Sequence, residues 1–395
     1  MKYSNTDIMD LSSFEPGIFK QQLEYKSFSP NYINHPWVIS SIEINKLLSE
    51  ANRFVGELNA FSQIVPNVDF FIYLYITKEA NKSSKIEGTQ TNLEEALMNK
   101  EDISPEKRDD WEEVRNYIDA INNSIEKLEE LPISNRLLKQ AHKILLSGVR
   151  GKHKLPGDYR KSQNWIGATL RDASFIPPHH TEINELMSDL EKFIHNTEFQ
   201  VPHLIKIAII HYQFETIHPF LDGNGRLGRL LITLYLVSSK VIEKPALYLS
   251  DFFEKNRHYY YDNLMSVRLT GNMEQWIKFF LVGVIETAKD AIQVFKDILS
   301  LQQEIESARL PVFGTRAKKN AIKLLENLYK FPVVPDAKYV DNLLGTSSST
   351  TNRLIDKFVE LKILSEITGY KRNRMYIFKP YLDIFSATVE KKSDI

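Results

Sequence analysis

Apolar residues recur three or four positions apart along most of this 395-residue chain. That spacing places them on one face of an α-helix, and it predicts long helices over residues 43–61, 70–87, 111–131 and 183–196. A shorter helix is predicted within residues 91–101, where Asn92 and Glu95 have the spacing of a capping box. We therefore expect a mostly α fold.

One stretch in the middle of the chain breaks the helical pattern. Residues 155–178, LPGDYRKSQNWIGATLRDASFIPP, contain two glycines, three aromatic residues and a closing Pro-Pro pair. Glycine and proline interrupt regular structure, so this composition predicts a β-hairpin or an extended flap instead of a helix.

The pattern changes again after about residue 300. Residues 309–314, RLPVFG, predict a linker, and residues 337–378 predict a helix, a turn, a second helix (347–362) and a hairpin with a basic tip (371–374). Between Arg316 and Lys379 the sequence has thirteen Lys and Arg against six Asp and Glu, a net charge of +7 in a chain whose total is −1. This asymmetry marks the C-terminal part as a functional candidate of its own.

The composition excludes several classes of site. The chain has no cysteine, so it forms no disulfide, no thiolate metal site and no cysteine nucleophile, which favours a reducing compartment. Its first sixteen residues lack the basic and apolar blocks of a signal peptide. The longest apolar run, residues 230–237, is far shorter than the roughly 20 residues that cross a bilayer. We therefore expect a cytoplasmic protein without a membrane partner.

The segment HPFLDGNGRLGR, from His218 to Arg229, collects the side chains that suggest chemistry. Its three glycines have the G-x-G-x-x-G spacing of a dinucleotide-binding turn, which must follow a strand and open a helix. The preceding residues 202–217 begin with a proline, which suits a first helical turn, and are too many for an average strand. We therefore expect a helix, a tight loop and a second helix, and no Rossmann turn.

The loop has the features of a polyphosphate site. Its glycines permit a turn whose free N–H groups form an anion nest at the positive end of the second helix. Arg226 and Arg229 share one helix face, Asp222 could hold Mg²⁺ on a polyphosphate, and His218 is suited to proton transfer near neutral pH. Each of these residues alone also has an ordinary structural role, as a helix cap, a turn stabiliser or a solvated charge.

With every defined position filled, this segment resembles the signature of Fic-domain proteins, H-x-F-x-[DE]-G-N-G-R-x-x-R, whose enzymes typically transfer AMP from ATP to a protein hydroxyl. The resemblance implies that His218 deprotonates a Ser, Thr or Tyr hydroxyl and that Asp222 binds Mg²⁺. It implies that Arg229 holds the γ-phosphate and that Phe220 anchors the loop from beneath. The nucleotide site implied by this resemblance comprises Glu87, Gly223, Asn224, Gly225, Arg226, Leu227, Gly228, Arg229, Tyr260 and Tyr261.

Two further stretches resemble parts of the same family. Residues 252–264 resemble the helix behind the nucleotide, where Tyr260 and Tyr261 would line the adenine pocket unless they are ordinary core or surface tyrosines. Residues 162–178 resemble the family's flap, to whose edge an extended target segment could add by main-chain pairing. A hairpin that serves packing alone is the alternative.

An N-terminal motif resembles the family's built-in inhibitor. Ser83, Glu87 and Gly88 fit [ST]-x-x-x-E-[GN] at the end of the helix predicted over residues 70–87. In the family this glutamate pairs with the second arginine of the signature, here Arg229, and ATP then binds unproductively. The resemblance implies autoinhibition by Glu87, unless Glu87 is an ordinary exposed residue at a helix end. In some relatives the same glutamate positions water that removes AMP.

The C-terminal part resembles a winged helix-turn-helix, which the longer bacterial Fic proteins often carry. Its second helix begins with serine and threonine hydroxyls and Arg353, which could contact the phosphates or base edges of DNA. Winged helices also serve dimerisation and protein docking, so the sequence leaves both DNA binding and a homodimer open.

We predict three regions: an N-terminal helical region with the inhibitory helix (1–105), a Fic core (106–300) and a winged-helix domain (301–395). The predicted function is adenylylation of a hydroxyl, on a target protein or on the chain itself, with ATP and Mg²⁺. Two alternatives remain. One is a DNA-binding regulator that uses the Fic core as a nucleotide sensor, and the other is a Fic enzyme that transfers another nucleotide-derived group or removes AMP.

Overall fold

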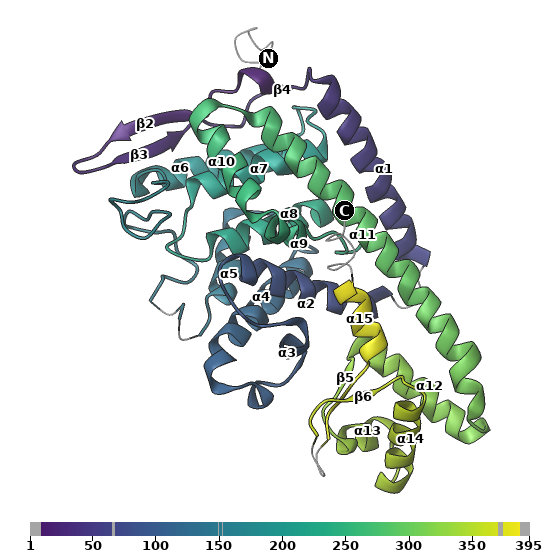
Figure 1. The fold of residues 1–395 in the computed structure, drawn as a ribbon. Helices are drawn as coiled ribbons and strands as arrows, with labels where there is room; N and C mark the ends of the chain where they lie inside the picture. The colour runs from purple at the N-terminus through teal and green to yellow at the C-terminus, as the bar shows by residue number, and fades with distance from the viewer. Residues whose placement is uncertain (1–8, 65–67, 149, 152, 370–373, 388–395) are drawn as a thin grey trace.

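The computed structural model describes residues 9–64, 68–148, 150–151, 153–369 and 374–387. The fold is mostly helical, as predicted (Figure 1), and the long helices expected from the apolar spacing are present. They are α1 (Ile42–Ile64), α2 (Val68–Ile86), α4 (Arg108–Lys127) and α6 (Ile183–His195). The short helix α3 (Leu93–Leu97) has the expected capping box, in which the Glu95 amide donates to the Asn92 side chain at 2.8 Å.

Two helices form the centre of the molecule. α7 (His203–Ile217) is buried on every face from Leu204 onward, and α8 (Asn224–Ser238) is buried over most of its length. A helix that is largely apolar all round belongs in the interior of a protein, which explains the isoleucine-rich sequence of α7. The predicted order of helix, tight loop and helix is confirmed, so the G-x-G-x-x-G spacing here is no Rossmann turn.

The remaining helices of the main body surround this pair. α5 (Asn135–Leu145) packs against α4, and the long helix α11 (Met273–Glu304) lies along α1 (Figure 1). The helix expected over residues 252–264 is in fact two helices, α9 (Ser250–Lys255) and α10 (Arg257–Thr270). They are separate because the backbone leaves helical geometry at Asn256.

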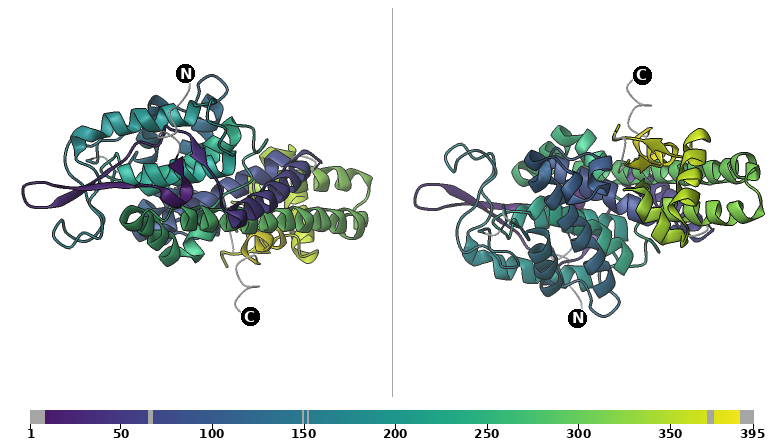
Figure 2. Two further views of the ribbon diagram at one scale, coloured as in Figure 1. Left: turned by 90° about the horizontal axis from the view of Figure 1, so that it is seen from above. Right: turned by 90° about the horizontal axis from the view of Figure 1, so that it is seen from below.

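Strands are few and short. β2 (Gly17–Gln21) and β3 (Lys26–Pro30) form an antiparallel hairpin that projects from one end of the molecule, away from the end formed by α11 and α12 (Thr315–Lys330) (Figure 2). The sequence gives no signal for this hairpin, since its turn, residues 22–25, has no Gly, Asn or Pro. β1 (Met9–Asp10) pairs in parallel with β4 (Trp37–Val38).

The predicted flap over residues 155–178 is mainly irregular. It closes through one antiparallel bridge, in which the Ile166 amide donates to the Phe175 carbonyl at 2.9 Å. The Phe28 amide of β3 donates to the Ile176 carbonyl at 2.9 Å. The expected hairpin is therefore reduced to a single bridge, and the N-terminal hairpin supports it from the side.

The C-terminal part has the predicted order of helix, turn, helix and hairpin. After α12 come β5 (Val333–Val334), α13 (Ala337–Leu344), α14 (Ser348–Glu360), β6 (Ser365–Glu366), β7 (Tyr376–Ile377) and α15 (Lys379–Ala387). The three strands form an antiparallel sheet in the order β5-β7-β6. Of the predicted basic tip, residues 371–373 lie outside the described residues.

This C-terminal part packs closely on the main body. α12 contacts α2, and α15 contacts α11. The predicted boundary after residue 300 falls within α11, which ends at Glu304. The segment 309–314, expected as a linker, begins with a helical turn in which Leu310 is buried, so the two parts are joined by packed structure.

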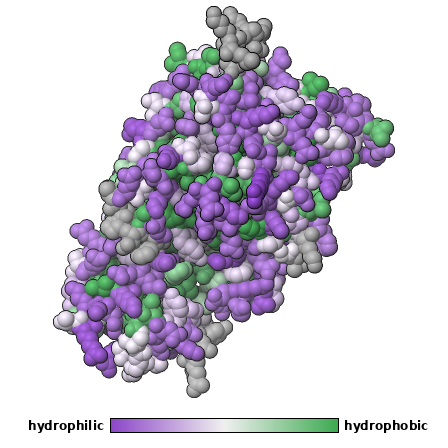
Figure 3. Space-filling model, turned by 180° about the vertical axis from the view of Figure 1, so that it is seen from behind, coloured by the Kyte–Doolittle hydropathy of each residue, from purple (hydrophilic) through white to green (hydrophobic). Residues whose placement is uncertain are grey.

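The surface seen from behind is mainly hydrophilic, with hydrophobic groups in small separate patches (Figure 3). Among the described helices, none combines the length and the apolar character needed to cross a bilayer.

Candidate active site

The loop between α7 and α8 holds the predicted catalytic residue, His218. This residue ends α7 in the left-handed conformation (φ 49°, ψ 60°), which few non-glycine residues adopt, and its amide donates to the Phe214 carbonyl at 3.0 Å. Its own carbonyl accepts from Arg160 Nε at 3.0 Å and from Asn164 Nδ2 at 3.2 Å. Hydrogen bonds from two side chains of the flap to the His218 carbonyl therefore fix this unusual turn.

The His218 ring is neutral at physiological pH. Burial lowers its pKa to about 4, and the nearby positive charges of Arg268 and Arg160 act in the same direction. Its Nδ1 is buried, and a main-chain contact of the ring with Glu215 opposes part of this lowering. An uncharged imidazole is the form that a general base requires.

Aromatic stacking fixes the loop from beneath, as predicted for Phe220. Phe220 is fully buried, and its ring stacks on His142 of α5 with centroids 3.8 Å apart. His142 Nδ1 accepts from the Gly157 amide at 2.9 Å, so its Nε2–H donates to the Asp222 carbonyl at 3.0 Å. Asn224 closes the loop from inside, since it accepts from the Phe220 amide and donates to the Phe220 carbonyl.

The start of α8 has the geometry of an anion nest. Gly223 caps the helix with φ 73°, and its amide donates to the Asp222 carboxylate at 2.6 Å. The amides of Asn224, Gly225 and Arg226 follow in the first turn, where helix N–H groups have no acceptor within the helix. Together with the helix dipole these amides form a cradle for phosphate oxygens.

Two residues assigned to the nucleotide site have packing roles instead. Leu227 is fully buried in the hydrophobic core, and its amide is used within α8 because it donates to the Gly223 carbonyl at 3.0 Å. A Cβ at Gly228 would overlap the carboxylate of Glu215 on α7, so this glycine permits close contact between the two central helices. Neither position presents a donor to the cradle.

Arg226 and Asp222 lie at the outer edge of this cradle. The buried Arg226 guanidinium pairs with Glu113 of α4 at 2.9 Å and approaches the Asp222 carboxylate at 3.6 Å. The Asp222 side chain is 46% exposed. Among the described residues no three acidic or histidine side chains gather as a metal site, and Mg²⁺ commonly needs only one or two carboxylates when phosphates supply further oxygens. The single exposed carboxylate of Asp222 fits such an ion.

Arg229 of α8 is held by residues at the end of α2. Its buried guanidinium donates to Ser83 Oγ and to the Ser83 carbonyl, both at 2.9 Å, and pairs with Glu87 Oε1 at 2.7 Å. The predicted ion pair between Glu87 and Arg229 is therefore present. A Cβ at Gly225 would overlap the Glu87 carboxylate, so the pair lies directly against the first turn of α8.

The pair also sets the charge states of both partners. Burial disfavours the charged form of each, but the opposite charge prevails, so the pKa of Glu87 lies below its usual value and the pKa of Arg229 lies above. Gly88 follows the end of α2 at φ 109°, the helix stop expected from the motif. The end of α2 therefore presents a carboxylate to Arg229 whose charged form is favoured by the pair.

Of the two tyrosines assigned to the adenine pocket, Tyr260 lies in the core and Tyr261 is partly exposed. Tyr260 is buried in the core, where its hydroxyl bonds His211 Nε2 at 2.8 Å and its ring stacks on Phe253. It has no free face for a base. Tyr261 follows it on α10 and is 36% exposed, and its charge interactions with Glu87 and Arg229 place it beside the ion pair.

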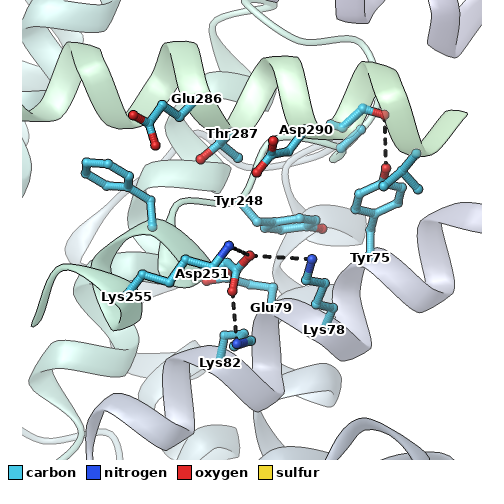
Figure 4. A pocket seen from close by; sticks show the side chains of 14 residues that line it. Tyr75, Lys78, Glu79, Lys82, Tyr248, Asp251, Lys255, Glu286, Thr287 and Asp290 are labelled. Carbon is cyan, nitrogen blue, oxygen red and sulfur yellow. Dashed lines mark hydrogen bonds and ion pairs between the residues drawn. The ribbon is translucent and has the colours of Figure 1, made fainter. Parts of the chain in front are cut away.

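The face of α2 opposite Glu87 is fastened by other charges. Figure 4 shows the Asp251 carboxylate of α9 between Lys78 and Lys82 of α2, at 3.5 and 3.0 Å, in a pocket closed by α11. Lys255 adds a third ammonium at 3.0 Å, and the lysines together hold the pKa of Asp251 below its usual value against the effect of burial. These ion pairs join α2 to α9.

Three residues of the site gave no signal in the sequence. They are His142 beneath the loop, Glu113 against Arg226, and Arg160 against the backbone of His218. Each lies on an element remote from the signature, and each acts through a contact that no local spacing records.

The chain resembles known proteins in two adjoining segments. Residues 45–126 match the model of the Fic/DOC family N-terminal region, and residues 132–236 match that of the Fic/DOC family. The chain therefore carries a Fic domain together with the N-terminal region described for that family. The second match contains the whole loop and α8 up to Leu236, and the first contains α2 with Glu87.

Curated relatives share part of this region. The chain is 31% identical over 128 residues to the protein adenylyltransferase Fic of Aedes aegypti, which covers 31% of this chain and 22% of that protein. It is 28% identical over 169 residues to a probable protein adenylyltransferase of Aquifex aeolicus, which covers 42% of this chain and 50% of that protein. The chain thus spans about a fifth of the first relative and half of the second.

Solved structures support the same fold. A Fic family protein from Desulfovibrio desulfuricans aligns with a TM-score of 0.54 at 20% identity, over 87% of this chain and 98% of that one. A Fic domain containing signaling protein from Bacteroides thetaiotaomicron aligns with a TM-score of 0.52 at 18% identity, over 64% and 97%. At these identities the likeness concerns the fold alone.

Proposed function

We propose that this chain is a protein adenylyltransferase that transfers AMP from ATP to a hydroxyl of a target protein, or of the chain itself. The observation that supports this best is the combination of a neutral His218 with an anion cradle at the start of α8. A hydroxyl needs a base to become a nucleophile, and a triphosphate needs oriented N–H groups and cations to bind.

In this proposal each group of the loop has one task. His218 accepts the proton of the target hydroxyl as the hydroxyl oxygen attacks the α-phosphorus. The bond from the α-phosphorus to the oxygen that bridges to the β-phosphate breaks, and pyrophosphate leaves. The amides at the start of α8 hold the phosphate oxygens, with Arg226 beside them. Asp222 would hold a Mg²⁺ ion, which neutralises phosphate charge when bound. Phe220 and His142 keep the loop rigid from beneath.

Autoinhibition follows from the contacts of Arg229. Its donors are engaged by Ser83 and Glu87, so a γ-phosphate would have to displace Glu87 to reach this guanidinium. Removal of one partner of a buried ion pair leaves the other charge uncompensated, which makes spontaneous opening rare. We propose that the chain as it stands binds ATP unproductively.

Labelling of ATP at two different phosphates tests which group is transferred. The Glu87→Gly chain is incubated with ATP labelled at either the α- or the γ-phosphate, alone and with cell extract as a source of targets. The proposal expects protein-bound label from the α position only. Label from the γ position only would instead indicate a kinase, and the absence of label with ATP combined with label from another nucleoside triphosphate would indicate a different donor.

The same chain also tests for AMP removal. If Glu87 positions water for this reaction, wild-type protein added to purified adenylylated product releases AMP, whereas the Glu87→Gly chain does not. If the chain only adds AMP and does not remove it, neither chain should release AMP from the product.

The C-terminal part supports a second proposed activity, binding of DNA. At the start of α14 the side chains of Ser348, Ser349, Thr350, Asn352 and Arg353 are all exposed. This is the end of a recognition helix that contacts DNA in helix-turn-helix proteins. A mobility-shift assay should show binding that weakens steeply with added salt, because phosphate contacts release counterions. Binding that is insensitive to salt would exclude it.

A further inference from the structure

Arg160, at the beginning of the flap, is a second buried guanidinium near the site. Its side chain is almost fully buried, and its donors all point to main-chain carbonyls. Nε donates to His218 at 3.0 Å, and Nη1 donates to Ser162 at 3.2 Å. Nη2 donates to Pro178 at 2.6 Å and to Ile217 at 3.4 Å. One side chain thus joins both ends of the flap to the end of α7.

This guanidinium has no carboxylate partner among the described residues, in contrast to Arg226 and Arg229. Burial lowers its pKa to about 10, so it remains charged at physiological pH. A buried charge without a counter-ion is costly unless its donors are satisfied. The planar fork of arginine satisfies them with four carbonyls in fixed directions, which the point charge of a lysine cannot do.

The neighbouring residues strengthen the same connection. The Arg160 amide donates to the Pro219 carbonyl at 3.0 Å. Asn164 Nδ2 donates to the carbonyls of His218 and Phe220, at 3.2 and 2.8 Å. Three consecutive carbonyls of the loop, from His218 to Phe220, are therefore held by Arg160 and Asn164 of the flap, and the left-handed residue His218 is the first of them.

We propose that Arg160 is a positioning residue for the transfer reaction, because it holds the flap and the backbone of His218 in one fixed arrangement. A target segment bound along the flap would then present its hydroxyl to an imidazole whose position is set by the same side chain. Arg160 touches neither the phosphate cradle nor Arg229, so ATP binding does not depend on it. This inference rests on the proposed adenylyltransferase activity and on the proposed role of the flap.

The test uses the full-length Glu87→Gly chain as parent and Arg160→Lys as the variant. Lys161→Met is the matched control, because Lys161 is the exposed next residue of the flap. The kcat and the KM for ATP are measured with an acceptor that the parent labels. Cleavage by trypsin after Arg171, on the exposed part of the flap, is followed by mass spectrometry as a readout that needs no activity.

We expect kcat to fall about 100-fold in Arg160→Lys, the loss that a displacement of about 1 Å causes in a reacting pair. We expect the KM for ATP to stay the same, the cleavage after Arg171 to become faster, and Lys161→Met to match the parent. Asn164→Ala, which keeps Arg160, should change kcat and cleavage in the same direction by a smaller factor. It decides the question if Arg160→Lys does not fold.

Two results would overturn the inference. One is a variant whose kcat and cleavage rate equal those of the parent, and the other is a loss that appears equally in the KM for ATP. If the parent labels no acceptor, the proposed function fails. The cleavage rates of Arg160→Lys and Asn164→Ala then decide alone whether Arg160 holds the flap.

Discussion

Two of the buried arginines at the site, Arg229 and Arg160, are held in opposite ways. Arg229 is bound by a hydroxyl, a carbonyl and the carboxylate of Glu87, and that ion pair raises its pKa against the effect of burial. Arg160 is bound by four main-chain carbonyls, and burial lowers its pKa. Both guanidiniums are satisfied, but only the first is satisfied by a charge that a phosphate could replace.

The difference separates a contact that can open from one that cannot. An anionic ligand can compete with Glu87 for Arg229, since both supply negative oxygens to the same donors. No ligand competes with backbone carbonyls that belong to the loop and the flap themselves. The contact of α2 with α8 is thus suited to regulation, and the contact of the flap with α7 is suited to hold geometry.

The largest effect on the rate of AMP transfer is expected at His218, where the flap holds the end of α7. In the Glu87→Gly chain, the substitution His218→Ala should reduce AMP transfer about 1000-fold, since it removes the general base. His179→Ala, at the far end of the flap, is the control and should leave the rate unchanged. Rates of incorporation of α-labelled ATP measure both. A His218→Ala chain as active as its parent would place the base elsewhere.

A buried carboxyl on α7, that of Glu215, makes the stability of the chain depend on pH. Glu215 of α7 has one unpartnered oxygen among the described groups, and burial raises its pKa from 4.5 to about 7, although Arg229 opposes this shift. A carboxyl with a raised pKa binds its proton more tightly in the folded chain. The free energy of unfolding therefore falls as pH rises from about 4.5 to 7, and the loss persists above pH 7.

Glu215→Gln removes this titration. The variant should be more stable than wild type by about 3 kcal/mol at pH 8 and nearly equal to it at pH 5, as urea unfolding at the two pH values would measure. Glu243→Gln, at an exposed position, is the control. A stability difference that is the same at both pH values would mean that Glu215 ionises normally.

The contact between α7 and α8 tests the rigid support of the loop. Gly228→Ala places a methyl group against the Glu215 carboxylate and should destabilise the chain by about 1–3 kcal/mol. Gly56→Ala, within α1, meets nothing within 4 Å and should instead stabilise it by about 0.5–1 kcal/mol. Thermal unfolding of the two variants measures both signs. Equal shifts would show that α7 and α8 separate easily.

Much of this arrangement could be predicted from local patterns. The long helices follow from apolar spacing, and the loop with its two arginines follows from a motif of twelve residues. Tyr260 shows the limit of such motifs, since position on α10 alone did not reveal that its ring lies in the core against Phe253.

The contacts that support the loop could not be predicted in this way. Arg160 lies 58 positions from His218, His142 lies 80 from Asp222, and Glu113 lies 113 from Arg226. Only the packing of α4, α5 and the flap around α8 brings these pairs together. The β2–β3 hairpin was missed for another reason, because its turn contains none of the residues that mark turns.

The smallest effect on the rate of transfer is expected at the contact of α2 with α8, which a ligand could open. Ser83→Ala removes one of the acceptors of Arg229 and should raise transfer by the otherwise wild-type chain about fivefold, the equivalent of one hydrogen bond. Ser84→Ala is the matched control, because Ser84 is an equally buried neighbour whose hydroxyl has no partner among the described groups. Equal rates in the two variants would mean that Ser83 does not restrain Arg229.

The central claim is that the charge of Glu87 keeps Arg229 from ATP. The most direct test compares the initial rates of transfer from α-labelled ATP by wild type, Glu87→Gln and Glu87→Gly. Glutamine keeps the shape of the side chain and removes its charge, so we expect both variants to exceed wild type, by about 100-fold for Glu87→Gly, the worth of one donor to a developing phosphate charge. Equal rates in all three chains would contradict the account.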